Sequence, residues 1–214
     1  MEAKQVETKT LIISLAIVFC VEFAMRLILP EQVLHSMALL GVARFLQTGL
    51  IIFSVAAWGQ GVSCIGLAPS KMVSGFKKGL IWSAGFGIVV LLAFAALYMA
   101  NVNMLALIHA RLPKEPGTLA LHLLVGGIVG PVAEEVFFRG VLYGFLRRWG
   151  VLVALTISTL LFVLAHPVFH GVFVPQVIGG ILFAVAYEVE GSLLVPITIH
   201  TLGNLAIFTL SLIT

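Results

Sequence analysis

Charge is what this sequence has least of. Only 10% of its 214 residues are Asp, Glu, Lys or Arg, whereas 61% are apolar. A soluble domain is about a quarter charged and about half apolar, so this composition excludes an ordinary soluble fold. The net charge of +3 is small and scattered along the chain, which gives no basis for binding nucleic acid. The composition predicts an integral membrane protein, with residues 1–214 forming one domain.

Cysteine is nearly absent as well. Cys20 and Cys64 are far apart in the sequence and form no CxxC pair, so the sequence has no disulfide framework. The N-terminal stretch "MEAKQVETKT" has no clear small-x-small cleavage pattern. We therefore expect the apolar run that follows it to be retained as a membrane span.

Long apolar runs are abundant, and a helix needs about 20 apolar residues to cross a bilayer. The sequence predicts an all-α, polytopic transmembrane bundle of seven or eight spans. The candidates are residues 11–29, 37–58, 79–100, 118–148, 151–165, 173–187 and 192–212. The run 118–148 would be ~45 Å long as a straight helix, which exceeds the ~30 Å hydrocarbon layer. Because it contains "GGIVGP", we expect a kink or a helix start near Gly130–Pro131.

Lys and Arg in short loops orient a membrane protein, because cytoplasmic loops carry an excess of them. They predict a cytoplasmic N-terminus and place Glu134 and His166 toward the outer half of the membrane. The residues that mark the cytoplasmic side are Lys4, Lys9, Lys71, Lys77, Lys78, Arg147 and Arg148.

Three charged residues nevertheless lie inside the apolar stretch "GPVAEEVFFRG". A charge at the bilayer centre costs roughly 2.5–3.5 kcal/mol, so such residues must pair or line a wet cavity. Glu135 and Arg139 are at i,i+4 spacing and should form an ion pair. Glu134 has no cation nearby in sequence, and a freer carboxylate in a desolvated site can act as a general base. Glu22 and Arg26 have the same i,i+4 spacing, and we expect a structural pair there.

Further polar groups lie on the last apolar stretches. His166 ends one predicted span, while His200 and Asn204 share a face of the final helix at i,i+4 spacing. Such groups can simply form hydrogen bonds between helices, with no catalytic role. Together with Glu134 they could also supply a base, a second group that orients water, and two donors for the oxyanion of a tetrahedral intermediate. That set suits the hydrolysis of an amide by an activated water molecule, with no cofactor.

The three clusters have a recognisable order. "EEVFFR" fits EExxxR, "FVLAH" fits FxxxH, and "HTLGN" fits HxxxN. Each motif is weak alone, but the ordered trio on hydrophobic spans resembles the CPBP family (CAAX protease and bacteriocin-processing, also called Abi). This is a family of glutamate-type intramembrane proteases that includes the Ras-converting CAAX endoprotease. The resemblance covers residues 118–210 and implies a site in a helical cavity, without a metal ion.

The resemblance implies a role for each matched residue. Glu134 and His166 would activate the water, and His200 and Asn204 would form the oxyanion hole. Glu135 and Arg139 would support the site, with Glu135 a candidate second contact to the water. Phe162 would line the cavity and contact the substrate, although ordinary core packing is an equal alternative.

The family also implies a substrate. We expect a membrane-embedded or membrane-anchored peptide or protein, cleaved near its C-terminus in a prokaryotic inner (cell) membrane during maturation or sorting of exported proteins. Three alternatives stay open. The protein could be a CAAX-type prenyl-protein endoprotease, a zinc protease using His166, His170, His200 and a glutamate, or a non-catalytic bacteriocin-immunity or transport protein.

Overall fold

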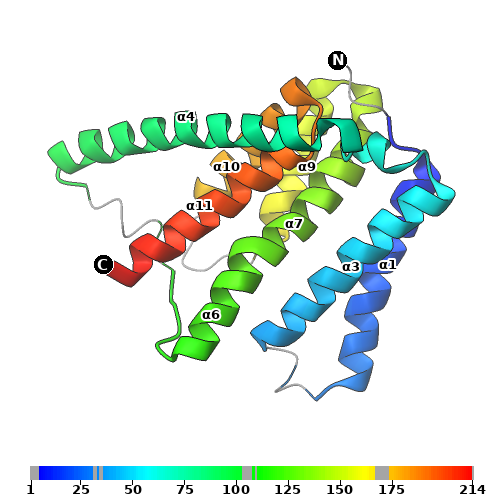
Figure 1. The fold of residues 1–214 in the computed structure, drawn as a ribbon, viewed down its shortest axis with the longest axis horizontal. Coiled ribbons are helices and arrows are strands. Elements are labelled where there is room, and N and C mark those ends of the chain that lie inside the picture. Colours follow the sequence, from blue (N-terminus) through cyan, green and yellow to red (C-terminus); the bar gives the residue numbers. More distant parts are fainter. Residues whose placement is uncertain are drawn as a thin grey trace.

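The computed structural model describes residues 5–30, 33, 36–102, 108, 110–166 and 174–213. All regular structure in these residues is helical, which confirms the predicted all-α class (Figure 1). Seven long helical segments make up the described fold. They are α1 (Thr8–Ile28), α3 (Met37–Trp58), α4 (Met72–Met99), the continuous segment Pro116–Trp149, α9 (Val151–Leu164), α10 (Val174–Glu190) and α11 (Leu194–Ile213).

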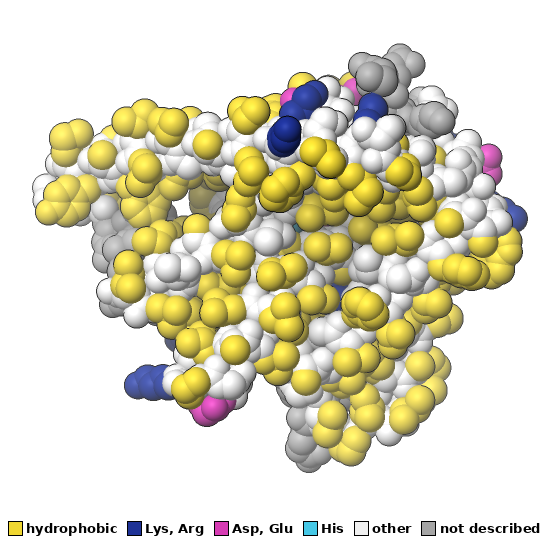
Figure 2. Space-filling view, viewed as in Figure 1, with side chains coloured by type: hydrophobic (Ala, Val, Ile, Leu, Met, Phe, Trp, Pro, Cys, Tyr) yellow, Lys and Arg dark blue, Asp and Glu magenta, His cyan; other side chains and the backbone are white. Residues whose placement is uncertain are grey.

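Five of the described helical segments are long and apolar enough to cross a membrane. These are Thr8–Ile28, Met37–Trp58, Val62–Met99, Pro116–Trp149 and Leu194–Ile213. The predicted seven or eight spans thus correspond to seven long helices, of which α9, with 14 residues, and α10, with 17, are shorter than a full crossing. Figure 2 shows hydrophobic side chains over most of the visible face, with Lys and Arg mainly near its edges. Such a surface suits contact with lipid and makes this a polytopic membrane protein.

Helix α4 begins at Met72, seven residues before the predicted start of its span, because two 3₁₀ turns, η1 (Val62–Ile65) and η2 (Pro69–Lys71), lead into it. It packs against α11 and then continues beyond the bundle (Figure 1). Gly79 allows this packing, since a Cβ atom there would lie 2.6 Å from the Cβ of Thr198.

The segment Pro116–Trp149 is one helical path with changing local geometry. It begins as α6 (Pro116–Leu124), where the Glu115 carboxylate accepts hydrogen bonds from the backbone N–H groups of Gly117 and Thr118. The remaining parts are a π-helical segment η3 (Val125–Val129), α7 (Gly130–Glu135), a π-helical segment η4 (Val136–Tyr143), α8 (Gly144–Leu146) and a 3₁₀ turn η5 (Arg147–Trp149). A new α-helical stretch therefore starts at Gly130, as expected near Gly130–Pro131.

The predicted pair between Glu22 and Arg26 is wrong. Glu22 instead accepts a hydrogen bond from Arg44 of α3 at 2.8 Å and another from Gln47 at 3.1 Å. Gln47 also donates to the backbone carbonyl of Val18, so the network joins α1 to α3. The i,i+4 spacing permits a contact, but a partner on the neighbouring helix competes for the same carboxylate.

Glu188 and Glu190 connect the end of α10 to other parts of the fold. Both lie in the last turn of α10 and form ion pairs with other helices. Glu188 pairs with Arg147 at 2.7 Å, and Glu190 pairs with Lys78 of α4. These contacts attach the end of α10 to α4 and to the end of the segment Pro116–Trp149.

The Glu188 ion pair predicts a pH dependence of stability. Hydrogen bonds from Arg147, and next from Tyr143, hold the pKa of the Glu188 carboxyl below its ordinary value. A carboxylate with a lowered pKa stabilises the fold above the pKa of the unfolded state, about 4.3, and this stabilisation is lost as the pH falls through the folded-state pKa. We expect Glu188→Gln to lower the melting temperature at neutral pH and to flatten its decline below about pH 5.

Thermal unfolding in detergent micelles at a series of pH values measures this effect. Comparing Glu188→Gln with the unmodified protein isolates Glu188 from the other carboxylates. Parallel profiles for the two proteins would show that the ion pair contributes nothing to stability.

Candidate active site

Three helices bring together a carboxylate and two imidazoles. Glu134 is on α7, His166 follows the end of α9, and His200 is on α11. The Oε2 atom of Glu134 lies 3.5 Å from Nε2 of His166 and 3.7 Å from Nε2 of His200. About a quarter of the Glu134 and His166 side chains is exposed, whereas His200 is buried. The arrangement is a partly accessible polar site within an apolar bundle.

Behind Glu134 is a buried charge pair. Glu135 and Arg139 are both 0% exposed, and the predicted i,i+4 contact is present, with Nη1 of Arg139 donating to Oε1 of Glu135 at 2.9 Å. The same Oε1 atom lies 2.8 Å from Nδ1 of His200. Arg139 also donates through Nη2 to the backbone carbonyl of Gly180 on α10, at 3.2 Å. Glu135 thus connects the first motif to the third, and Arg139 connects it to α10.

The hydrogen bonds indicate which imidazole nitrogens carry protons. Nδ1 of His166 lies 2.7 Å from the backbone carbonyl of Phe162, and a carbonyl only accepts, so Nδ1 is the donor. Nε2 of His166 therefore faces Glu134 as an acceptor when the ring is neutral. In the same way, Nδ1 of His200 donates to the carboxylate of Glu135, which Arg139 keeps as an acceptor. His200 donates from Nε2 only when both ring nitrogens carry protons.

Asn204 lies one turn beyond His200 on α11, and its side chain bonds to a backbone carbonyl that has lost its usual partner. Its amide Nδ2 donates to the carbonyl of Gly126 at 2.9 Å. In the π-helical stretch the N–H of Gly130 bonds to the carbonyl of Val125, so the next carbonyl, that of Gly126, would pair with residue 131. Residue 131 is proline and has no N–H. Asn204 supplies the missing donor, and its second amide hydrogen remains outside this bond.

Phe162 is at the site but is almost fully buried, with 2% of its surface exposed. Its ring centroid lies 4.5 Å from that of His166 and 4.3 Å from the Cζ atom of Arg139. It also packs edge to face against Phe138 and Phe183, so the ring contacts both the polar groups and the hydrophobic core. Contact of Phe162 with a substrate stays a prediction.

Sequence reasoning predicted a span at 173–187 but gave it no part in the site, because α10 carries none of the three motifs. Phe183 of α10 stacks on the His200 ring, with centroids 4.5 Å apart and ring planes 22° from parallel. Gly180, one turn earlier, accepts the hydrogen bond from Arg139. A phenylalanine and a glycine in an apolar helix carry no local signal of such roles, so only the tertiary structure identifies them.

The zinc alternative has no ligand set in the described part of the chain, where no group of three His, Cys, Asp or Glu side chains is arranged to hold a metal ion. His170, which entered that alternative, lies outside the described residues.

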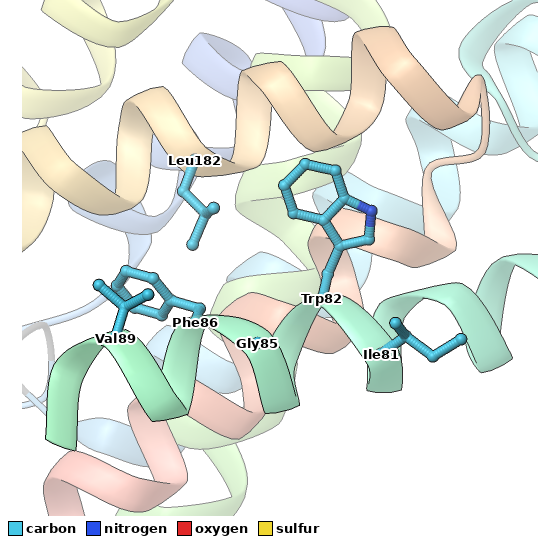
Figure 3. A pocket seen from close by; sticks show the side chains of 6 residues that line it. All are labelled: Ile81, Trp82, Gly85, Phe86, Val89 and Leu182. Atoms are coloured by element: carbon cyan, nitrogen blue, oxygen red, sulfur yellow. The ribbon is translucent and has the colours of Figure 1, made fainter. Parts of the chain in front are cut away.

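An apolar pocket of about 400 Å³ lies between α4 and α10 (Figure 3). Its lining is Ile81, Trp82, Gly85, Phe86, Val89 and Leu182. Trp82 and Leu182 also pack against the core cluster that contains Phe162 and Phe183. The pocket is therefore separated from the polar site by a layer of apolar side chains and contributes no chemistry of its own.

Comparison with known proteins shows what this part of the chain is similar to. A family model described as Rce1-like, type II CAAX prenyl endopeptidase, matches residues 116–206, the segment that holds all three motifs. This segment, which is less than half of the chain, is similar to that family. The membrane-embedded CAAX protease MroQ of Staphylococcus aureus (strain USA300) is 35% identical over 112 residues, which cover 49% of this chain and 42% of that protein. The alignment thus spans less than half of that relative's length. No solved structure matches the chain.

Proposed function

We propose that the protein is an intramembrane endopeptidase of the glutamate type, which hydrolyses a peptide bond near the C-terminus of a membrane-embedded or membrane-anchored substrate. The observation that carries the proposal is the opposition of two acceptors, Oε2 of Glu134 and Nε2 of His166, at 3.5 Å. The name of the relative, a CAAX protease, supports the same class of reaction.

Two facing acceptors are suited to hold a water molecule. The distance of 3.5 Å is longer than the usual 2.7–3.2 Å of an N–H···O bond, and a water molecule that lies beside the two atoms can contact both. Such a water would donate one hydrogen to Glu134 and one to His166, which leaves an oxygen lone pair free to attack a carbonyl carbon. Glu134 would take the proton as the new C–O bond forms.

The tetrahedral intermediate needs donors for its oxyanion and a proton for its leaving group. Asn204 would donate its second amide hydrogen, and His200 would donate from Nε2 with both ring nitrogens protonated. Glu134 would then pass its proton to the amine nitrogen as the C–N bond breaks. The second hydrogen of the water stays on the new carboxyl group and then passes to the amine, so the products are a carboxylate and an ammonium group, and no metal ion or cofactor takes part.

Glu135 would hold His200 through its Oε1 atom, and its Oε2 atom, which has no hydrogen-bond partner in the described structure, stays a candidate second contact to the water. Its Oε1 atom is already bonded to Arg139 and His200, and the side chain is 0% exposed. Its role in this scheme is to orient His200 and to hold a negative charge behind the ring. Arg139 in turn keeps that charge in place within the apolar core.

The proposal predicts metal-independent cleavage. The purified protein, reconstituted in liposomes, should cut a peptide that has one transmembrane segment and a fluorescent C-terminal tail. Its rate should be the same within about twofold after dialysis against EDTA and 1,10-phenanthroline. A second probe, identical but with a farnesylated cysteine four residues from its end, tests the prenyl-substrate alternative. Mass spectrometry of the products identifies the bond that is cut.

The outcomes separate the open alternatives. Cleavage of only the farnesylated probe would assign the CAAX-type activity. Loss of cleavage with chelators, restored by zinc, would contradict the glutamate-type mechanism. Intact probes under all conditions would favour a non-catalytic protein.

A further inference from the structure

His200 is attached to the buried charge pair by a hydrogen bond at one nitrogen only. Its Nδ1 atom donates to Glu135, and its Nε2 atom points toward Glu134 at 3.7 Å. A single hydrogen bond fixes the position of one ring atom but leaves the ring free to tilt about that bond. The direction of Nε2 therefore depends on what contacts the faces of the ring.

Phe183 supplies that contact. Its ring lies nearly parallel to the His200 ring, with centroids 4.5 Å apart, and only 7% of its surface is exposed. The Cζ atom of Arg139 lies 5.2 Å from the centre of the same phenylalanine ring. Phe162 meets Phe183 edge to face at 6.4 Å, which fixes the Phe183 ring in turn. One aromatic side chain thus contacts both the imidazole and the guanidinium that share Glu135.

Close packing against α9 and a hydrogen bond from Arg139 hold α10, and with it Phe183, in the position that this contact requires. Gly180 and Phe183 are three residues apart and lie on one face of the helix. A Cβ atom at Gly180 would lie 2.8 Å from the Cγ2 atom of Thr159 on α9, so the glycine allows α9 and α10 to approach closely. The Gly180 carbonyl accepts the second hydrogen bond of Arg139. The backbone of α10 and the ring of Phe183 thus act on the same two charged residues.

From these contacts we propose that Phe183 is a positioning residue, which sets the tilt of the His200 ring and so the direction of its Nε2 atom. The inference rests on the proposed function of His200 as an oxyanion donor. A misplacement of a catalytic group by about 1 Å can cost roughly 100-fold in rate. We expect Phe183→Leu to lower kcat by about 10- to 100-fold with KM changed less than about threefold, because the ring acts on the transition state.

The experiment compares three variants. Phe183→Leu keeps an apolar side chain but removes the flat ring, whereas Phe183→Tyr keeps the ring and should restore kcat to within about threefold of the unmodified protein. Phe45→Leu is the matched control, because Phe45 on α3 is 73% exposed and far from the motifs in sequence. All three are compared for folded fraction, kcat and KM on the cleaved probe.

A second measurement does not depend on activity. In protein labelled with ¹³C and ¹⁵N at histidine, the ring signals of His200 are assigned by their loss in His200→Asn. Stacking shields the ring protons, so Phe183→Leu should move these signals downfield and Phe183→Tyr should not. Unmoved signals in Phe183→Leu would overturn the proposal.

The kinetic outcomes are equally decisive. The proposal is overturned when Phe183→Leu keeps kcat within twofold, when it loses activity only in proportion to its folded fraction, or when Phe183→Tyr is as impaired as Phe183→Leu. Failure of the proposed function is a different result, in which Glu134→Gln cleaves normally while the His200 signals still respond to Phe183.

Discussion

Glu134→Gln is expected to abolish detectable cleavage, with a loss of about 10²–10⁴-fold or more, while the protein still inserts and folds. Glutamine has nearly the same shape as glutamate but cannot take a proton from water. Glu134 makes no ion pair with a lysine or arginine in the described structure, and its Oε2 atom has no hydrogen bond there. The substitution therefore leaves the buried charge pair of Glu135 and Arg139 intact, and the change in stability should stay within about 1 kcal/mol.

The measurement is single-turnover cleavage of the transmembrane probe, with the folded fraction determined in the same preparation. Glu7→Gln is the matched control, since Glu7 is exposed at the start of α1 and its side chain makes no capping hydrogen bond. It should cleave at the unmodified rate. Full proteolysis by Glu134→Gln would remove Glu134 from the mechanism, and loss of activity together with loss of the folded protein would assign it a structural role.

Sequence spacing predicted an ion pair correctly where leaving either charge buried and unpaired would cost free energy. Glu135 and Arg139 are both fully buried, so each needs an opposite charge, and the i,i+4 spacing provides it within one helix. Glu22 and Arg26 have the same spacing, yet Glu22 pairs with Arg44 of another helix. Spacing thus predicts which contacts are possible, and helix packing decides which one forms.

Long-range contacts were beyond the reach of sequence patterns. The hydrogen bond from His200 to Glu135 joins residues 65 positions apart, a contact that the spacing of the motifs does not reveal. The three motifs contain Glu134, His166 and His200, which the structure places together, because buried polar groups must find partners. They give no sign of Phe183, which is one apolar residue among many in α10 and gains its place only from how α9, α10 and α11 pack.

The lengths of the helices also show this limit. Apolar runs predicted a span at each of seven places, but hydropathy does not reveal whether a run crosses the bilayer or packs inside the bundle. Helix α9 has 14 residues, of which Phe162 and Val163 are among those buried by its neighbours. Its short length lets His166, just past its end, lie beside Glu134. The boundary of the helix, rather than its hydropathy, therefore positions the second motif.

Arg139→Met is expected to be the most destabilising single change near the site, at about 3–5 kcal/mol, because it leaves the carboxylate of Glu135 buried without its cation. The double variant Glu135→Gln/Arg139→Met should recover most of this loss. It removes both charges, while the amide oxygen of the glutamine still accepts the hydrogen bond from Nδ1 of His200. Arg111→Met is the matched control, since Arg111 is exposed between helices and should change stability by no more than about 0.5 kcal/mol.

Unfolding of the detergent-solubilised variants by SDS titration gives the stabilities, and the transmembrane probe gives the activities. The recovered double variant should still cleave at least about tenfold more slowly than the unmodified protein, because no negative charge then stands behind the protonated His200 ring. Stability and activity would thereby separate: the fold requires only that Glu135 and Arg139 match, whereas the reaction requires that they be charged. A double variant as unstable as Arg139→Met would show that Arg139 acts through its bond to Gly180 and its aromatic neighbours instead. A stable double variant with full activity would show that the charge of Glu135 has no part in the chemistry.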